Sequence, residues 1–249
     1  MIYNVWNVLL YEPLINALAF LVSIIPGGDV GVAVIVLTIL VKLLLFPFSQ
    51  KSIKNQVAMT ILAPELEKIK KSGVSKEEQA RLTFKLYKKH KTNPFSGCFL
   101  VLIQIPIIFA LYYVFFKGIN FESGLLYSFI HIPVKINMIF LGIIDLSKKS
   151  LFLAILAGIS QYLQAHFMPK LNTNTFTSGS LGESFGKSMQ MQMKYIFPFL
   201  VTWIAYSISG AVALYWITSN IFAVGQQIYV KKTEKMVLDE EVKILISEK

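Results

Sequence analysis

A lysine, Lys42, lies close to the middle of an apolar run that covers residues 30–48 (VGVAVIVLTILVKLLLFPF). Nineteen helical residues, each with a rise of about 1.5 Å, cover the hydrocarbon thickness of a bilayer. An ammonium group at that depth costs about 2.5 to 3.5 kcal/mol on insertion scales unless a counter-group or water solvates it. Extension of the side chain to the headgroups suits positions near helix ends instead. The run therefore predicts a membrane span with a wet cavity around Lys42.

The composition is that of a membrane protein. Hydrophobic residues make up 55% of the 249 residues and charged residues 15%, and the mean hydropathy is +0.59. These values would be abnormal for a soluble domain of this length. The single cysteine, Cys98, has no partner for a disulfide within the chain and no neighbouring histidines for a metal site. We expect it to be a small buried residue.

Apolar segments predict an all-α integral membrane protein with five spans, expected at residues 30–48, 95–116, 150–168, 194–208 and 210–230. Eleven of the 24 lysines and arginines lie in residues 50–94. The positive-inside rule makes that segment cytoplasmic, which places the N-terminus outside and the C-terminus inside. The expected divisions are an extracytoplasmic segment (1–29), a core (30–230) that includes a cytoplasmic hairpin (50–94) and a cytoplasmic loop (169–193), and a cytoplasmic tail (231–249).

Residues 1–25 predict an amphipathic helix on the outer membrane surface. On a helical wheel, one side is apolar and the other is polar; the apolar side holds Trp6, Leu9, Leu10, Leu14, Ala17 and Leu21, and the polar side holds Asn4, Glu12, Asn16 and Ser23. Pro26, Gly27 and Gly28 end the helix. A sixth span is the alternative, and it would move the N-terminus to the cytoplasm.

The cytoplasmic segment predicts a helical hairpin. The first helix is expected at residues 49–71, and a capping box of Ser75 and Glu78 opens a second helix that ends near Asn93. An apolar seam is expected from Ile53, Val57, Ile61, Leu82 and Leu86. Eleven basic and four acidic residues give the hairpin a net charge of +7. Its cations, among them Lys68, Lys70, Lys71, Lys76 and Arg81, are expected to dock an incoming chain or partner, or to hold the hairpin near anionic lipid.

An enzymatic function is not indicated. Residues 182–188 (GESFGKS) resemble a phosphate-binding loop but are one residue short, because Leu181 stands where the first glycine belongs. His90, His131 and His166 lie in separate segments, and the chain has no catalytic triad pattern or metal cluster. The tail holds five acidic and five basic residues, so it does not predict strong nucleic-acid binding. We expect no cofactor and no metal.

Polar residues within the expected spans predict a shared hydrophilic pocket. Thr38 and Lys42 are four residues apart and share a helix face. The other members are Gln104 in the second span, Gln161 and Gln164 in the third, and Trp216, Asn220, Gln226 and Gln227 in the fifth. Amides and hydroxyls in spans commonly bond neighbouring helices instead, which is the alternative for each taken singly.

Four stretches resemble the YidC/Oxa/Alb family of membrane protein insertases. Residues 38–47 (TILVKLLLFP) are similar to its first core span, and residues 87–90 (YKKH) with 93–98 (NPFSGC) to the entry of its second. Residues 104–112 (QIPIIFALY) and 214–220 (LYWITSN) with 226–227 (QQ) are similar to two later signatures. The stretches follow the family's order, and the resemblance covers nearly the whole chain.

The resemblance implies a five-span insertase core around a hydrated groove that is open to the cytoplasm and lipid. Lys42 would take the place of the groove's basic residue, and Thr38 and Trp216 would line the substrate's path. It further implies insertion of nascent membrane proteins into the bacterial inner membrane without nucleotide hydrolysis. The implied partners are nascent membrane proteins and lipids, with the Sec translocon, the signal recognition particle pathway and the ribosome. The alternatives are a small-solute transporter or channel with Lys42 as an anion site, and a lipid-binding or scaffold protein.

Overall fold

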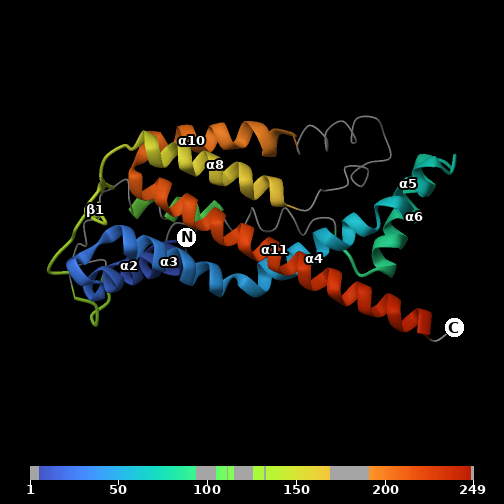
Figure 1. The fold of residues 1–249 in the computed structure, drawn as a ribbon, viewed down its shortest axis with the longest axis horizontal. Helices are drawn as coiled ribbons and strands as arrows, with labels where there is room; N and C mark the ends of the chain where they lie inside the picture. The colour runs from blue at the N-terminus through green and yellow to red at the C-terminus, as the bar shows by residue number, and fades with distance from the viewer. Residues whose placement is uncertain are drawn as a thin grey trace. The chain divides into compact units, whose positions relative to one another are not determined.

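The computed structural model describes residues 6–93, 105–110, 112–114, 126–131, 133–168 and 191–247. These residues are mostly helical, as predicted (Figure 1). The elements in chain order are η1 (Asn7–Tyr11), α2 (Glu12–Ile24), η2 (Pro26–Gly28), α3 (Val30–Leu44), α4 (Phe46–Ile61), α5 (Ala63–Lys71), α6 (Lys76–Lys89), β1 (Ile139–Phe140), β2 (Ile144–Asp145), α8 (Leu151–Phe167), η4 (Gln192–Ile196), α10 (Phe197–Ile208) and α11 (Gly210–Ser247).

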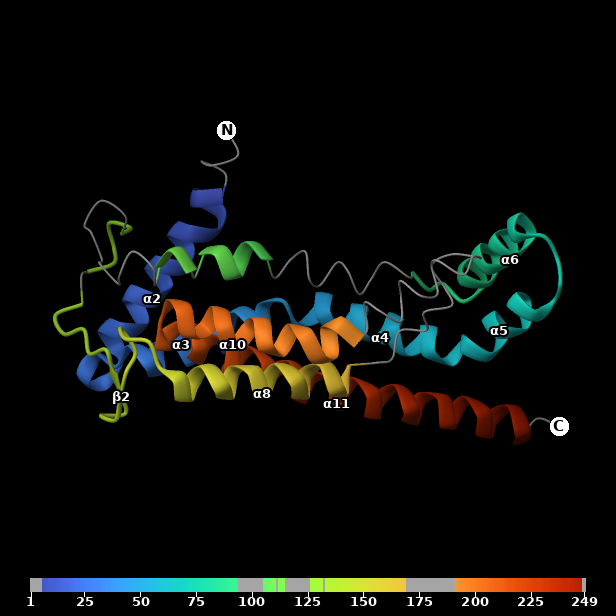
Figure 2. The same cartoon turned by 90° about the horizontal axis from the view of Figure 1, so that it is seen from above.

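Contacts divide the chain into two compact units. The first comprises Met1–Leu45, Val101–Gln164 and Phe197–Phe222, and the second Phe46–Leu100, Ala165–Ile196 and Ala223–Lys249. The larger hydrophobic core lies in the first unit and draws on α2, α3, α8, α10 and the start of α11. In that unit α8 lies beside α10 (Figures 1 and 2). The second unit has a smaller core of Met59, Leu62, Leu66, Leu86 and Tyr87.

The N-terminal helix differs from its expected division into two sides. Asn16, expected on the polar side, is only 2% exposed. Its amide nitrogen donates to the carbonyl of Glu12 at 2.7 Å, and its amide oxygen accepts from the backbone N–H of Tyr127 at 2.7 Å. These bonds compensate the burial of the amide. Leu9, expected on the apolar side, is 67% exposed. The prediction was wrong at these two positions because a helical wheel does not show which chain segments pack on the helix.

Few of the described helices have the length and hydropathy needed to cross a bilayer. Among the described residues, Asn7–Ile24 has both. The pair α3 and α4 would add a second if it formed one broken span, and Ile105–Val114 and Leu151–Phe167 are shorter apolar helices. The five-span count and the six-span alternative therefore stay predictions.

The first expected span breaks at Leu45. The helix α3 ends at Leu44 and α4 begins at Phe46, whereas one continuous apolar helix was expected through Phe48. Pro47 has no N–H to donate to the carbonyl four residues before it, and its ring crowds that carbonyl. A break at this position follows from the proline.

The hairpin of the second unit also contains a break that was not predicted. The first helix, expected at residues 49–71, is divided between α4 and α5 at Leu62, next to Pro64. The second helix opens as predicted, since the Ser75 hydroxyl accepts from the Glu78 N–H at 3.3 Å. It ends at Lys89, earlier than expected. The expected apolar seam was wrong at Ile61, which is 50% exposed, because Met59 and Leu62 enter the small core in its place.

A loop, residues 126–150, joins the starts of three helices of the first unit. The N–H of Val30, at the start of α3, donates to the Asn137 carbonyl at 3.0 Å. The N–H of Gly210, at the start of α11, donates to the Lys148 carbonyl at 2.9 Å. The Ser150 hydroxyl accepts from the Leu153 N–H in the first turn of α8 at 3.3 Å. The loop therefore lies where α3, α8 and α11 begin.

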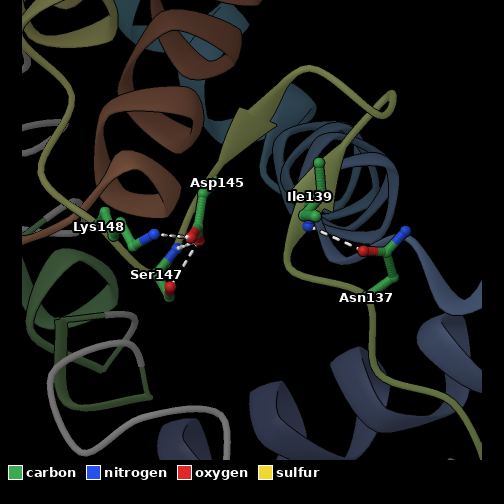
Figure 3. A network of polar contacts seen from close by, with 5 residues as sticks. All are labelled: Asn137, Ile139, Asp145, Ser147 and Lys148. Atoms are coloured by element: carbon green, nitrogen blue, oxygen red, sulfur yellow. Dashed lines mark hydrogen bonds and ion pairs between the residues drawn. The ribbon is translucent and has the colours of Figure 1, made fainter.

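Within this loop, β1 and β2 form a small antiparallel pair that the sequence did not predict. Figure 3 shows the polar contacts beside it. The Asp145 carboxylate accepts from the hydroxyl of Ser147 at 2.5 Å and from the ammonium of Lys148 at 3.0 Å. The hydrogen bond from Ser147, and next that from Lys148, lower the pKa of Asp145 below its usual value. The Asn137 amide oxygen accepts from the Ile139 N–H at 2.9 Å.

Asp29 ties this loop to α3. One carboxylate oxygen accepts from the N–H groups of Gly31 at 2.8 Å and Val32 at 3.1 Å, which caps the helix, and the other accepts from Leu141 at 2.9 Å. We expect Asp29→Ala to lower the free energy of unfolding by about 1 to 2 kcal/mol, as for other N-cap losses. Asp29→Asn keeps a capping oxygen and loses only the acceptor for Leu141. In thermal unfolding in detergent, the unfolding temperature should be highest for wild type, intermediate for Asp29→Asn and lowest for Asp29→Ala. An equal loss in both variants would contradict a capping role.

Candidate functional site

The described residues include one hollow next to a predicted groove residue. It lies in the first unit and is small, with a cavity volume of about 10 Å³, which is room for about one water molecule. Seven residues line it: Leu14, Val34, Leu37, Thr38, Val41, Ile107 and Tyr215. Thr38 and Tyr215 are the lining residues that carry a hydroxyl group, and the other five have apolar side chains. Such a lining suits an apolar side chain better than a charged one.

Thr38 and Lys42 lie on α3, as the sequence predicted. Thr38 is 3% exposed, and its hydroxyl donates to the Val34 carbonyl one turn earlier at 2.6 Å. Lys42 lies one helical turn beyond Thr38 and is half-buried. The spacing places the ammonium on the side of α3 that carries Thr38. Helix geometry thus brings a cation near the apolar hollow without making it part of the lining.

The predicted residues of α8 and α11 make a separate polar cluster in the first unit. Asn220, 3% exposed, donates from its amide to the Ser160 hydroxyl at 3.0 Å. Ser160 in turn donates to the Ala157 carbonyl at 2.7 Å. Gln161 donates from its amide to the Gln164 amide oxygen at 3.1 Å. The bond between Asn220 and Ser160 joins α8 to α11, which was the alternative role for such residues.

Trp216 and Tyr215 lie side by side in sequence near the start of α11, and both are buried. Trp216 does not line the hollow, whereas Tyr215 does. The sequence analysis singled out Trp216 and missed Tyr215, although Tyr215 belongs to the same quoted stretch. The rotation of α11 about its axis, relative to α3, decides which of Tyr215 and Trp216 faces the hollow. A single sequence does not reveal that rotation.

Gln226 and Gln227 lie in the second unit, on the continuation of α11. The Gln226 amide donates to the Ser49 hydroxyl at 2.7 Å and to the Phe46 carbonyl at 3.3 Å, both in the first turn of α4. Lys231, one turn farther along α11, donates to the Phe167 carbonyl at the end of α8. Burial lowers the pKa of Lys231. These polar groups therefore connect helices of the second unit.

The hairpin cations are all exposed: Lys68, Lys70, Lys71, Lys76 and Arg81. Two of them pair with acids of their own helix. Lys71 lies 2.7 Å from Glu67, and Arg81 lies 2.8 Å from Glu78. The hydrogen bond and charge of Lys71 lower the pKa of Glu67. Exposed pairs of this kind contribute little to stability, so the surface remains available to a partner.

Other residues from the sequence analysis lie outside the described residues. These are the predicted groove residue Gln104, the lone thiol of Cys98 and the loop at 182–188. Over the part of the chain that the structure describes, no group of three or more His, Cys, Asp and Glu residues is placed to hold a metal ion.

Comparison with known proteins relates most of this chain to one family. The family model described as "60Kd inner membrane protein" matches residues 20–237. That range contains α3, α8, α10 and the hairpin helices, all of the predicted groove residues, and every residue that lines the hollow except Leu14.

Three relatives carry the name membrane protein insertase YidC. The protein of Fusobacterium nucleatum is 32% identical over 229 residues, which cover 90% of this chain and 97% of the relative. That of Clostridium tetani is 34% identical over 87% of this chain and 89% of the relative. That of Magnetococcus marinus is 34% identical over 91% of this chain, which spans only 36% of that longer protein.

Proposed function

The chain belongs to the 60Kd inner membrane protein family, which is the YidC/Oxa family, and from this membership we propose that it inserts nascent membrane proteins into the bacterial inner membrane. The observation that carries the proposal is the similarity to the insertase of Fusobacterium nucleatum, because it extends over nearly the full length of both chains. The five-span core and the divisions at residues 1–29, 30–230 and 231–249 belong to the same proposal.

The proposed groove combines two chemical environments. The apolar residues around the hollow beside Thr38 contact an apolar side chain of the incoming segment, for which the hollow has to widen. Lys42, one turn away on α3, attracts an acidic or polar tail of the same segment and holds water near it. Gln104, Gln161, Gln164, Trp216 and Asn220 complete the groove in this proposal. The internal bond between Asn220 and Ser160 supports a second, structural role for Asn220.

Insertion by this route needs no nucleotide. The segment's tail passes through the groove, and its apolar helix then moves into lipid. About 20 apolar residues, at several tenths of a kcal/mol each, outweigh the cost of moving a short polar tail. Burial of apolar surface is thus the proposed source of free energy.

The hairpin is the proposed first contact for an incoming chain on the cytoplasmic side. The five exposed cations singled out above lie on α5 and α6, which pack through Leu66 and Leu86 in a core of their own. Nascent chains and membrane lipids are the proposed partners, and the Sec translocon, the signal recognition particle pathway and the ribosome are candidates for delivery. The proposed orientation keeps the N-terminus outside and the C-terminus in the cytoplasm.

Photocrosslinking to a ribosome-stalled membrane protein tests the proposal. A photoreactive amino acid at Val41, which is half-buried and lines the hollow, should crosslink to the nascent chain. The matched control is Trp203 on α10, which is 67% exposed and does not line the hollow. Val41 and Tyr215 are better probe positions than Trp216, because both line the hollow. Equal crosslinking from Val41 and Trp203, or none from Val41, would contradict a groove at this place.

A further inference from the structure

Loop 126–150 exposes several large apolar side chains. Phe129 is 74% exposed, Val134 99%, Leu141 64% and Ile143 80%. Soluble surfaces seldom gather so many exposed apolar side chains within so few residues unless they bind something. The packing of the first unit leaves these side chains uncovered, although Leu146 of the same loop is fully buried in the core.

The place of the loop limits what covers these side chains. Its backbone bonds the starts of α3 and α11, and Ser150 caps the start of α8. All three helices are apolar from their first turns. A loop at the shared end of apolar helices in a membrane protein lies at the boundary between hydrocarbon and headgroups.

The charge of the loop suits the same boundary. Over its described residues it carries three cations, Lys135, Lys148 and Lys149, and one acid, Asp145. Lys148 pairs with Asp145 at 3.0 Å, which leaves a net positive charge on Lys135 and Lys149, both exposed. Cations at a membrane surface are attracted to anionic lipid headgroups.

We propose that loop 126–150 is a lipid-binding anchor: Phe129, Val134, Leu141 and Ile143 insert into the interface of the outer leaflet, and Lys135 and Lys149 bind the phosphates of anionic headgroups. Apolar side chains with flanking lysines are the combination that holds peptides in this zone. The inference rests on the proposed function only for the membrane location and the orientation.

Anchoring the loop fixes the depth of α3. Asp29 and Asn137 bond the loop to the first residues of α3, so the loop and the helix start move together. An inserted loop then holds that start at the headgroup level, and with it the distance from the membrane surface to Thr38 and Lys42. The anchor therefore positions the groove without touching a substrate.

The test uses a fluorescent probe on single cysteines in the full chain, after replacement of Cys98 by serine. The probe is placed by Val134→Cys or Ile143→Cys, and the reference position in water is Val74→Cys in the turn between α5 and α6. The protein is reconstituted in vesicles of phosphatidylcholine with phosphatidylglycerol. Nitroxide-labelled lipids should quench the probe at positions 134 and 143 but not at position 74. Aqueous iodide should quench the probe several-fold less at positions 134 and 143 than at position 74.

Two results would overturn the anchor. Iodide quenching as strong at 134 and 143 as at 74 would place the loop in water. Protection from iodide without quenching by nitroxide lipids would mean that protein, such as a second copy, covers the loop. In vesicles without phosphatidylglycerol, Lys135→Ala with Lys149→Ala should have no effect on quenching, whereas with that lipid the pair should reduce nitroxide quenching. No substrate is present, so the outcome is independent of whether the chain inserts proteins.

Discussion

Replacing Gly158 with leucine should destabilise the first unit more than any other single change proposed here, by about 3 kcal/mol, the upper end of overpacking costs. Gly158 lies on α8 where α10 comes closest. A Cβ atom at this position would lie 2.0 Å from the Thr202 hydroxyl oxygen and 3.0 Å from the Pro198 carbonyl oxygen. The hydroxyl is held in place because it donates to the same carbonyl at 2.9 Å. A side chain therefore requires the helices to separate.

A graded series with controls separates this clash from general effects of losing a glycine. Gly158→Ala should cost less than Gly158→Leu, and adding Thr202→Ala should restore part of the loss. Gly225→Ala on α11 is the matched control, since nothing lies within 4 Å of a Cβ there. It should be neutral or stabilising by up to about 1 kcal/mol, as expected for alanine in a helix. Thermal unfolding in detergent measures all four; equal effects at 158 and 225 would contradict close packing of α8 on α10.

Reversing the charge at Lys42 should impair insertion of substrates with acidic tails far more than of substrates with neutral tails. At about 6 Å and an effective dielectric of about 20, a unit charge pair is worth about 3 kcal/mol, or about a hundredfold in groove occupancy. Lys42→Arg keeps the charge and should keep activity, whereas Lys42→Glu repels the acidic tail. Lys42→Ala should lie between them.

The measurement is a reconstituted insertion assay with both tail types and matched amounts of each variant. Equal loss for both tails would mean that Lys42 maintains hydration or packing of the groove and does not attract the tail. Unchanged insertion in every variant would remove Lys42 from the mechanism.

Sequence patterns predicted which segments are helical better than where each helix begins and ends, and they missed the pair of β1 and β2. The helical class, the capping box at Ser75 and Glu78 and the starts of α8 and α10 near the expected positions follow from local chemistry. The breaks at Leu45 and Leu62 were missed, although Pro47 and Pro64 stand beside them. Proline also fits the first turn of a helix, so its position alone does not decide between a helix start and a break within an expected helix.

The polar residues show the limit of reasoning from single positions. Thr38 reached the hollow, but Asn220 and Gln226 bond other helices within their own units. Their partners, Ser160 and Ser49, are small hydroxyl residues whose roles depend on which helices meet. The burial of Asn16 likewise depends on Tyr127, more than a hundred residues away. Long-range pairing of this kind leaves no periodic signal in one sequence.

The break between α3 and α4 has a consequence for the hydrogen bonding of the backbone. Pro47 has no N–H to donate to the Leu43 carbonyl. The Leu45 N–H instead donates to the carbonyls of both Leu43 and Val41. The carbonyl of Phe46, at the start of α4, is also paired. It accepts from the Ser49 hydroxyl at 3.0 Å and from the Gln226 amide of α11. In hydrocarbon each unpaired peptide group is costly and draws in water. Here the Leu45 N–H and the side chains of Ser49 and Gln226 supply partners, so the bend leaves fewer carbonyls unpaired than the proline alone would.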